Sequence, residues 1–399
     1  MAQHCINELM KIAIPKERWA DEARVAATPD TVKKFVSLGC EVVIEAGAGE
    51  RSSNSDTAFT KAGATIKKDV ANIIGDADIV LRVQRPMGEQ DGDINEIEMM
   101  KTGAILIGNL SALSFLEQAE AYAQKGLTVF ALELLPRIGR AQSMDVLSSQ
   151  SNLAGYKAVL DATTEFTRAL PMMMTAAGTI PPAKVIVLGA GVAGLQAIAT
   201  ARRLGAIVTA YDVRPAVKEQ VESLGAKFIE VDPNAINDAE TPDGYATEMP
   251  SDYQEKQREV LQKALKKNDI VICTALIPGR PAPVLIPEDV VQEMREGSVI
   301  VDLAVEQGGN CILSELGKTV VKHCVTIIGH ANVPSRLAAD ATSLYAKNLL
   351  HFVSLLIDTE KGSISINWED EIIQGCTIVR RGEIVNTALA DTIKTAKAS

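Results

Sequence analysis

Short apolar runs alternate with segments whose apolar residues recur at helical spacing along almost the whole chain. Consecutive β-prone apolar residues are typical of buried parallel strands, and a spacing of three to four residues indicates a helix with one buried face. This alternation predicts an α/β fold built on parallel sheets. Strands are expected at Lys11–Ile14, Glu41–Glu45, Ala77–Val83, Leu127–Leu132, Asp269–Thr274, Ser298–Asp302 and Val325–Ile328.

Several helices can be placed by their end signals and apolar faces. Thr28 before Pro29 is typical of an N-cap followed by the first helical residue, and Gly39 is placed to end that helix. Further helices are expected at about 114–124 and, with a strongly polar surface, at Ser251–Lys266. Two long helices, about Gln150–Leu170 and Pro334–Ile357, are predicted to join two domains.

The segment Val185–Asp212 carries the most chemical information. An apolar strand leads into Gly189, Gly191 and Gly194 at the G-x-G-x-x-G spacing, and a helical apolar stripe and a second strand follow. In a dinucleotide-binding turn the first glycine allows a sharp bend, the second admits a pyrophosphate and the third allows close helix packing. Strand, turn, helix, strand and acid in this order therefore predict dinucleotide binding rather than an ordinary tight turn.

Asp212 ends the second strand of this segment, where an acid would meet an adenosine ribose. A carboxylate accepts a hydrogen bond from a 2′-hydroxyl and repels a 2′-phosphate, so Asp212 favours NAD over NADP. Arg214 leaves an alternative open, because it could pair with such a phosphate or be a solvated surface charge.

The predicted organisation is two Rossmann-like domains with parallel sheets, joined by the two long helices, with a cleft between them. The first domain comprises 1–148 and 335–399, and the NAD(H)-binding domain 149–334 is inserted into it. Segment 231–250 interrupts the pattern with Pro, Gly, Asn and Asp, and loops of this kind often act as lids. Tyr245 would give the lid an apolar residue to bury over a ligand.

Composition narrows the possible functions. With 399 residues and 47% hydrophobic residues, the chain can form two soluble domains. A net charge of −11 argues against non-specific nucleic-acid binding. Six scattered cysteines indicate a reduced, cytoplasmic protein, and four dispersed histidines do not suggest a metal site. No apolar run approaches the length of a membrane span.

A second segment, Arg137–Gly155, places arginine, glutamine, aspartate and serine in one loop before a long helix. It resembles the nicotinamide-holding loop of the NAD(H)-binding component, domain I, of proton-translocating NAD(P) transhydrogenase. The resemblance extends over nearly the whole chain, through motifs such as Arg24–Pro29, Asp302–Gly309 and His330–Arg336.

The resemblance implies roles for particular residues. Arg137, Asp145 and Ser148 would orient the dihydronicotinamide and its carboxamide, and Gln142 would reach toward NADP(H) on a partner component. Tyr245 would close over bound NAD(H). The rest of the cofactor site would comprise Gly189, Ala190, Gly191, Val192, Ala193, Gly194, Asp212, Val213, Arg214, Thr274, Ala275 and Leu276.

In the family this component is a homodimer that docks on the NADP(H)-binding component, which sits on a membrane-spanning proton channel. Hydride passes directly between the two nicotinamide rings. Because the chain ends at Ser399 without a membrane segment, the membrane parts are expected on other chains. The resemblance therefore implies a cytoplasmic protein held peripherally at the inner membrane by its partners.

Alanine dehydrogenase shares this architecture and is the main alternative. That family is expected to have a lysine in a Lys-x-Lys-Glu-Pro run and a histidine in a Leu-His-Leu run. Gln84 and Asn109 stand at those positions here, and neither can transfer a proton at neutral pH. A third possibility, a nucleotide sensor without catalysis, would not need the loop around Arg137.

Overall fold

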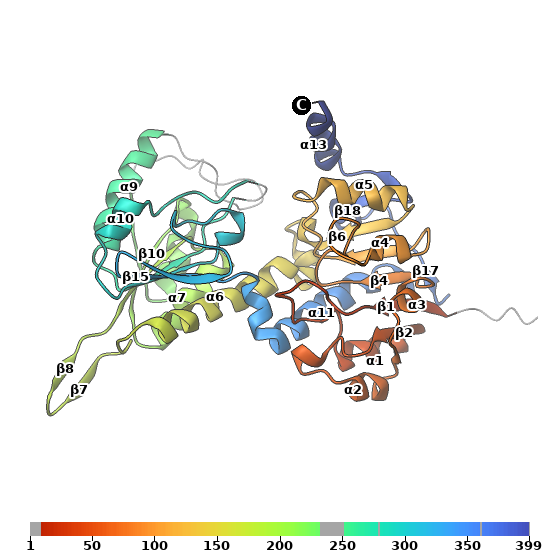
Figure 1. Ribbon diagram of the computed structural model, residues 1–399, viewed down its shortest axis with the longest axis horizontal. Coiled ribbons are helices and arrows are strands. Elements are labelled where there is room, and N and C mark those ends of the chain that lie inside the picture. The colour runs from red at the N-terminus through yellow and green to blue at the C-terminus, as the bar shows by residue number, and fades with distance from the viewer. Residues whose placement is uncertain (1–8, 232–250, 278–279, 360, 399) are drawn as a thin grey trace, which may run out of the picture. The chain divides into compact units, whose positions relative to one another are not determined.

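The computed structural model describes residues 9–231, 251–277, 280–359 and 361–398, and the chain splits into two compact units (Figure 1). Unit 1 comprises Met1–Gln150 and Leu337–Ser399, and unit 2 comprises Ser151–Arg336. The predicted lid from residue 232 on, with Tyr245, lies outside the described residues. The predicted cleft between the domains stays a prediction.

Unit 1 is built on an eight-stranded sheet with the order β19-β18-β6-β5-β4-β1-β2-β3. From β3 to β6 all neighbours are parallel, while β18 and β19 add an antiparallel edge beside β6. The strands are β1 (Met10–Ile14), β2 (Cys40–Glu45), β3 (Thr65–Lys67), β4 (Ile79–Leu81), β5 (Ile105–Gly108), β6 (Thr128–Ala131), β18 (Thr377–Arg380) and β19 (Glu383–Ile384).

Unit 2 is built on a seven-stranded sheet with the order β11-β10-β9-β12-β13-β15-β14. The chain runs outward from β9 to β11, returns to the other side of β9 and continues to β15, which is the Rossmann strand order. Among the strands that the structure describes in this sheet, only β14 is antiparallel to its neighbour. The strands are β9 (Lys184–Leu188), β10 (Ile207–Tyr211), β11 (Lys227–Phe228), β12 (Ile270–Cys273), β13 (Val299–Asp302), β14 (Lys318–Lys322) and β15 (Val325–Gly329).

Each sheet buries both of its faces. In β9, Val185 and Val187 pack with helices α6 and α7, and Ile186 and Leu188 pack with α9 and α10. The sheet of unit 1 is covered in the same way by α1 and α11 on one face and by α3 and α5 on the other. The helices are α1 (Pro29–Ser37), α2 (Asp56–Lys61), α3 (Ala71–Ile74), α4 (Glu96–Met99), α5 (Leu116–Gln124), α6 (Val146–Glu165), α7 (Val192–Arg203), α8 (Lys218–Ser223), α9 (Ser251–Leu265), α10 (Glu288–Gln292), α11 (Ala338–Ser354), α12 (Glu371–Cys376) and α13 (Thr387–Ala398).

The predicted α/β class is confirmed, and so is the helix start at Thr28, whose side chain accepts from the Thr31 amide. The sheets are mainly parallel as predicted, and they add antiparallel strands at their edges, namely β14 in unit 2 and β18 and β19 in unit 1. The predicted strand 77–83 is shorter, because Arg82 leaves β4 to join a group of buried charges.

The two long helices have different bounds from those predicted. α6 begins at Val146 because Asp145 caps it, and it ends at Glu165. Phe166 and Leu170 lie beyond it but are buried in unit 2, which explains why their spacing extended the predicted helix. The predicted helix 334–357 is a short 3-10 helix, η6 (Val333–Leu337), followed by α11.

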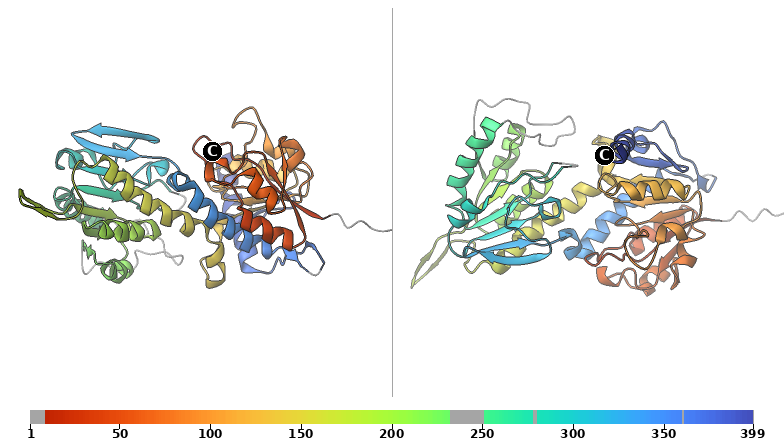
Figure 2. Two further views of the ribbon diagram at one scale, coloured as in Figure 1. Left: turned by 90° about the horizontal axis from the view of Figure 1, so that it is seen from below. Right: turned by 45° about the horizontal axis from the view of Figure 1, so that its top comes forward.

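A hairpin not predicted from the sequence, β7 (Met173–Thr175) and β8 (Gly178–Ile180), lies between α6 and β9. It extends out of unit 2 in both further views (Figure 2). Met172, Met173, Met174 and Ile180 are exposed on it. Among the residues that the structure describes, no helix combines the length and apolar character needed to cross a membrane.

Candidate functional site

The chain bends sharply where β9 passes into α7, at the point where the strand order of unit 2 reverses. Gly189 has φ +97°, and a Cβ there would lie 2.7 Å from Thr274 Oγ1. A Cβ on Gly194 would lie 1.9 Å from the Gly189 carbonyl oxygen. Any larger residue at either position would therefore force the turn, α7 and β12 apart.

Gly191, between these two, is different. Its φ of −76° is one that any residue can adopt, and a Cβ there would meet no atom within 4 Å. α7 begins at the next residue without a side-chain cap, so the amides of its first turn are left for another acceptor. Open space in front of uncapped amides and a positive helix end suits a phosphate group.

Gly155 supports the same turn from α6, a role that sequence reasoning missed. A Cβ on Gly155 would lie 2.0 Å from the Ala193 carbonyl oxygen. Glycine there lets α6 lie directly against the first turn of α7. A glycine within a predicted helix was the available signal, because it lowers helix stability unless close packing requires it.

Asp212 lies directly after β10, and its buried carboxylate is held by four donors. Its Oδ2 accepts from the Ala190 amide at 2.7 Å, which ties the acid to the glycine turn. Arg214 provides the other three donors: its amide and Nε bind Oδ1, each at 2.9 Å, and its Nη2 binds Oδ2 at 2.8 Å. A carboxylate has about four lone-pair sites, so these four donors together account for the acceptor capacity of Asp212.

The segment after β12 forms the other side of the turn. Thr274 Oγ1 donates to the Gly189 carbonyl at 2.9 Å. The buried Asn310 carboxamide holds Ala275 on both sides, with Oδ1 accepting from the Ala275 amide at 3.0 Å and Nδ2 donating to its carbonyl at 2.9 Å. Asn310 is a positioning residue that sequence reasoning missed, since the pairing spans 35 residues. Leu276 follows on the surface.

The polar loop of unit 1 contains a 3-10 helix, η3 (Gly139–Met144), and leads into α6. Ala141, Met144 and Val146 are buried and anchor the loop in the core, while Arg137 and Gln142 are exposed. Asp145 Oδ1 accepts from the Ser148 amide at 2.9 Å, and its Oδ2 accepts from Ser148 Oγ at 2.5 Å. The pair thus caps α6 and fixes both side chains at the loop's end.

Charged side chains fill the point where the strand order of unit 1 reverses, beyond β1 and β4. Arg24 forms a two-pronged pair with Glu22, Nε to Oε1 at 2.7 Å and Nη2 to Oε2 at 2.6 Å. Gln84 Nε2 donates to the same Glu22 carboxylate at 2.7 Å. Arg24 and Gln84, the residue in the expected lysine position, are therefore both bound to one acid of the chain itself.

A second group of buried charges lies beside these. Arg82, with no exposed surface, binds Glu96 at 2.9 Å and Glu17 at 3.2 Å. Burial raises the pKa of Glu17 from 4.5 to about 7; Arg82 opposes this shift and Glu22 and Glu96 add to it. This reversal point holds paired side chains where unit 2 has a glycine turn.

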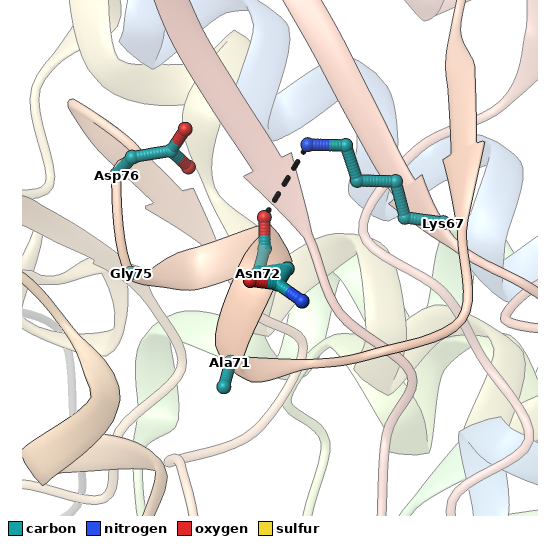
Figure 3. Close-up of a pocket in the computed structure, with 5 residues that line it drawn as sticks. All are labelled: Lys67, Ala71, Asn72, Gly75 and Asp76. Carbon is teal, nitrogen blue, oxygen red and sulfur yellow. Dashed lines mark hydrogen bonds between the residues drawn. The ribbon is translucent and has the colours of Figure 1, made fainter.

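A surface pocket in unit 1 is lined by Lys67, Ala71, Asn72, Gly75 and Asp76 (Figure 3). Lys67 Nζ donates to the Asn72 carbonyl at 3.5 Å across it. None of the predicted site residues lines this pocket. The structure thus brings the glycine turn together with Asp212 and Thr274 in unit 2, and Asp145 together with Ser148 in unit 1.

Two doubly wound sheets, one with a glycine turn and an acid at its reversal point, define an α/β protein of the Rossmann class. The chain belongs to the alanine dehydrogenase/PNT family. The N-terminal domain of that family matches residues 13–154, and its C-terminal domain matches residues 158–387.

Within this family the chain is most informatively compared with three proteins. It is 58% identical to the first part of NAD(P) transhydrogenase subunit alpha of Rhodospirillum rubrum, over 95% of this chain and 99% of the relative. A solved transhydrogenase structure from Sinorhizobium meliloti matches with a TM-score of 0.83 and 49% identity, covering 94% of this chain and 100% of that one. Alanine dehydrogenase of Halomonas elongata is 30% identical over 96% of both chains. The resemblance to transhydrogenase is confirmed, and alanine dehydrogenase is a more distant relative.

Proposed function

We propose that this chain is the NAD(H)-binding component of a proton-translocating transhydrogenase. It would bind NAD(H) and pass hydride directly to or from NADP(H) on a partner component, while separate membrane chains translocate protons. The likeness to the transhydrogenase alpha subunit of Rhodospirillum rubrum, over nearly the full length of both chains, carries this proposal. The open space at Gly191 beside Asp212 supports a dinucleotide in unit 2.

The resemblance assigns cofactor roles to residues of unit 2, and the geometry of the glycine turn supports them. The pyrophosphate would lie against Gly191 and the uncapped amides of Val192 and Ala193, with Gly189, Ala190 and Gly194 shaping the turn. The adenosine ribose would bind Asp212, beside Val213 and Arg214. Thr274, Ala275 and Leu276 would border the cofactor on the β12 side. Tyr245 keeps its proposed role as the residue that closes over NAD(H).

The loop of unit 1 would hold the dihydronicotinamide. Arg137, Asp145 and Ser148 would orient the ring and its carboxamide, and Gln142 would face the partner's nucleotide. Arg137 and Gln142 are exposed while Ala141 and Met144 of the same loop are buried, which suits that role. When bound, NADH supplies the hydride, so the chain's residues need only bind, orient and exclude water. Such transfer requires neither a general acid or base nor a metal.

The buried charges of unit 1 argue against alanine deamination. An amino-acid substrate would need a free cation for its carboxylate, yet Arg24 is bound on two sides by Glu22. Its Nη1 also donates to Gln150 Oε1 at 2.8 Å. With Gln84 and Asn109 in place of the expected lysine and histidine, the proton-transfer groups are missing as well.

The proposal includes a homodimer that docks on an NADP(H)-binding component. The chain would then lie in the cytoplasm, held at the inner membrane through its partners. The β7–β8 hairpin supports the dimer, because Met172 and Met174 are 59% and 75% exposed on it. Exposed methionines grouped on one hairpin are typical of an interaction surface. A second copy is the occupant that we expect.

The deciding experiment mixes the purified chain with an NADP(H)-binding component and follows hydride transfer from NADH to an NADP analogue. Alanine-dependent reduction of NAD is measured in parallel on the chain alone. Transfer that requires the partner, without alanine oxidation, is the expected result. Alanine oxidation would overturn the proposal.

Gln142→Asn should slow transfer far more than it weakens NADH binding, since the substitution disturbs only the alignment of the two nicotinamide rings.

A further inference from the structure

Asn348 of α11 brackets the polar loop of unit 1. Its Nδ2 donates to the Ser143 carbonyl at 2.8 Å, and its Oδ1 accepts from Ser149 Oγ at 2.7 Å. Ser143 and Ser149 stand on the two sides of Asp145, so one side chain holds the backbone before the aspartate and the first helical turn after it. His351, one turn further along α11, also contacts the Ser143 carbonyl, at 3.1 Å.

The chemistry of Asn348 matches this double contact. A carboxamide carries a donor nitrogen and an acceptor oxygen as separate atoms of one planar group, whereas an ionised aspartate only accepts and leucine does neither. Asn348 is only 6% exposed, on a helix whose other buried residues are mostly apolar. A buried polar group destabilises the fold unless it is hydrogen-bonded, and here both of its ends are used.

The contact continues into the buried charges of unit 1. Ser149 Oγ, which donates to Asn348, also accepts a hydrogen bond from Gln150 Nε2 at 3.2 Å, and Gln150 Oε1 accepts from Arg24. Gln150 Nε2 also donates to the Ala341 carbonyl of α11 at 3.2 Å. The start of α6 is thus fixed to α11 and to the Arg24–Glu22 pair, and Asn348 extends this rigid frame to η3.

We propose that Asn348 is a positioning residue for hydride transfer, which it serves by holding the loop that carries Gln142, Asp145 and Ser148. This inference rests on the proposed function of that loop. Loss of Asn348 would let the loop shift without removing any group that touches the cofactor. Since a displacement of about 1 Å can reduce transfer about a hundredfold, the rate should suffer more than affinity.

The test compares Asn348→Asp and Asn348→Ala with the wild-type chain, each mixed with an NADP(H)-binding component. Aspartate keeps the shape and the Ser149 contact but turns an acceptor toward the Ser143 carbonyl. We expect single-turnover transfer at saturating NADH to fall about tenfold or more in both, while the NADH Kd of the isolated chain rises less than about threefold. Ser149→Ala removes one of the two contacts, so its transfer rate should lie between those of the wild-type chain and the Asn348 variants. It carries the test if the Asn348 variants do not fold.

Thr342→Val is the matched control, because Thr342 is another buried polar residue of α11 but accepts from the Val25 amide instead. It should lower the melting temperature and leave the transfer rate unchanged. Wild-type transfer in both Asn348 variants would overturn the inference. Asp145→Ala distinguishes failure of this inference from failure of the proposed function. If the Asp145→Ala variant also transfers hydride at the wild-type rate, the loop itself has no role in transfer.

Discussion

The two sheets share one strand order, β3-β2-β1-β4-β5-β6 in unit 1 and β11-β10-β9-β12-β13-β15 in unit 2, yet their reversal points differ in content. In unit 2 the strands β9 and β12 are followed by Gly189 and Thr274, and space remains at Gly191. In unit 1 the strands β1 and β4 are followed by Glu17 and Arg82, which bind each other in the interior.

The difference shows that topology provides a crevice but does not decide its use. Ligands of doubly wound sheets bind outside the carboxyl ends of the strands at the reversal point. Unit 2 keeps that position open with glycines, whereas unit 1 occupies it with paired charges. The paired charges make the reversal point of unit 1 rigid. The polar loop of unit 1, with exposed Arg137 and Gln142, carries the groups that the proposed function needs. Function therefore follows from the residues at each crevice, not from the shared fold.

The largest expected effect comes from breaking the buried charges of unit 1. Arg82→Met removes the cation paired with buried Glu17 and leaves Glu96 with Arg18 alone, which should reduce the free energy of unfolding by about 3–5 kcal/mol. Both tryptophans, Trp19 and Trp368, belong to unit 1, so tryptophan fluorescence in urea follows this unit. Arg140→Met, at the exposed pair with Asp370, is the control and should change little.

A second test uses pH. Burial raises the pKa of Glu17 to about 7, above its unfolded 4.5, so the folded chain binds the proton more tightly. The stability from this group is complete below pH 4.5 and is lost as pH rises to about 7, by up to about 3 kcal/mol. Glu17→Gln should therefore flatten the fall in unfolding free energy between these values. Equal slopes in the two proteins would contradict the prediction.

The glycine turn of unit 2 can be tested with two matched substitutions. Gly191→Ala adds a methyl group where no protein atom lies within 4 Å, so stability should hold while NADH affinity falls about ten- to a hundredfold. Gly194→Ala forces a clash with the Gly189 carbonyl and should lower both. NADH fluorescence titration and thermal melts monitored by circular dichroism measure the two effects. Unchanged NADH binding by Gly191→Ala would place the pyrophosphate elsewhere.

The smallest expected effect concerns Arg214. Because its guanidinium shares the Asp212 carboxylate, Arg214→Gln frees that acid for a ribose and removes a cation that could attract a 2′-phosphate. The preference for NADH over NADPH should rise about three- to tenfold, as expected for one partly exposed charge. Titration with both nucleotides measures it. A fall in preference would show that Arg214 holds Asp212 in its working position.

Local signals predicted much of unit 2 and the first helix of unit 1. The strand β9, the glycine turn, the helix α7 and the strand β10 follow from residues within one stretch of chain, and Thr28 and Gly39 bound α1 as expected. The extent of α6 was misjudged, because Phe166 and Leu170 continue the apolar spacing after the helix has ended. The antiparallel edges escaped prediction, since short strands such as β18 and β19 carry little periodicity.

The sequence by itself determined the α/β class, the glycine turn, the acid after β10 and the family resemblance, because each depends on residues close together in the chain. Only the tertiary structure decided that the Arg214 guanidinium binds the Asp212 carboxylate, that Glu22 binds both Arg24 and Gln84, and that Asn348 holds the polar loop on both sides of Asp145. The physical reason is that hydrogen bonds and ion pairs require atoms about 3 Å apart. In the contact of Asn348 with the Ser143 carbonyl, folding brings groups 205 residues apart in the chain to that distance, and no local pattern records it.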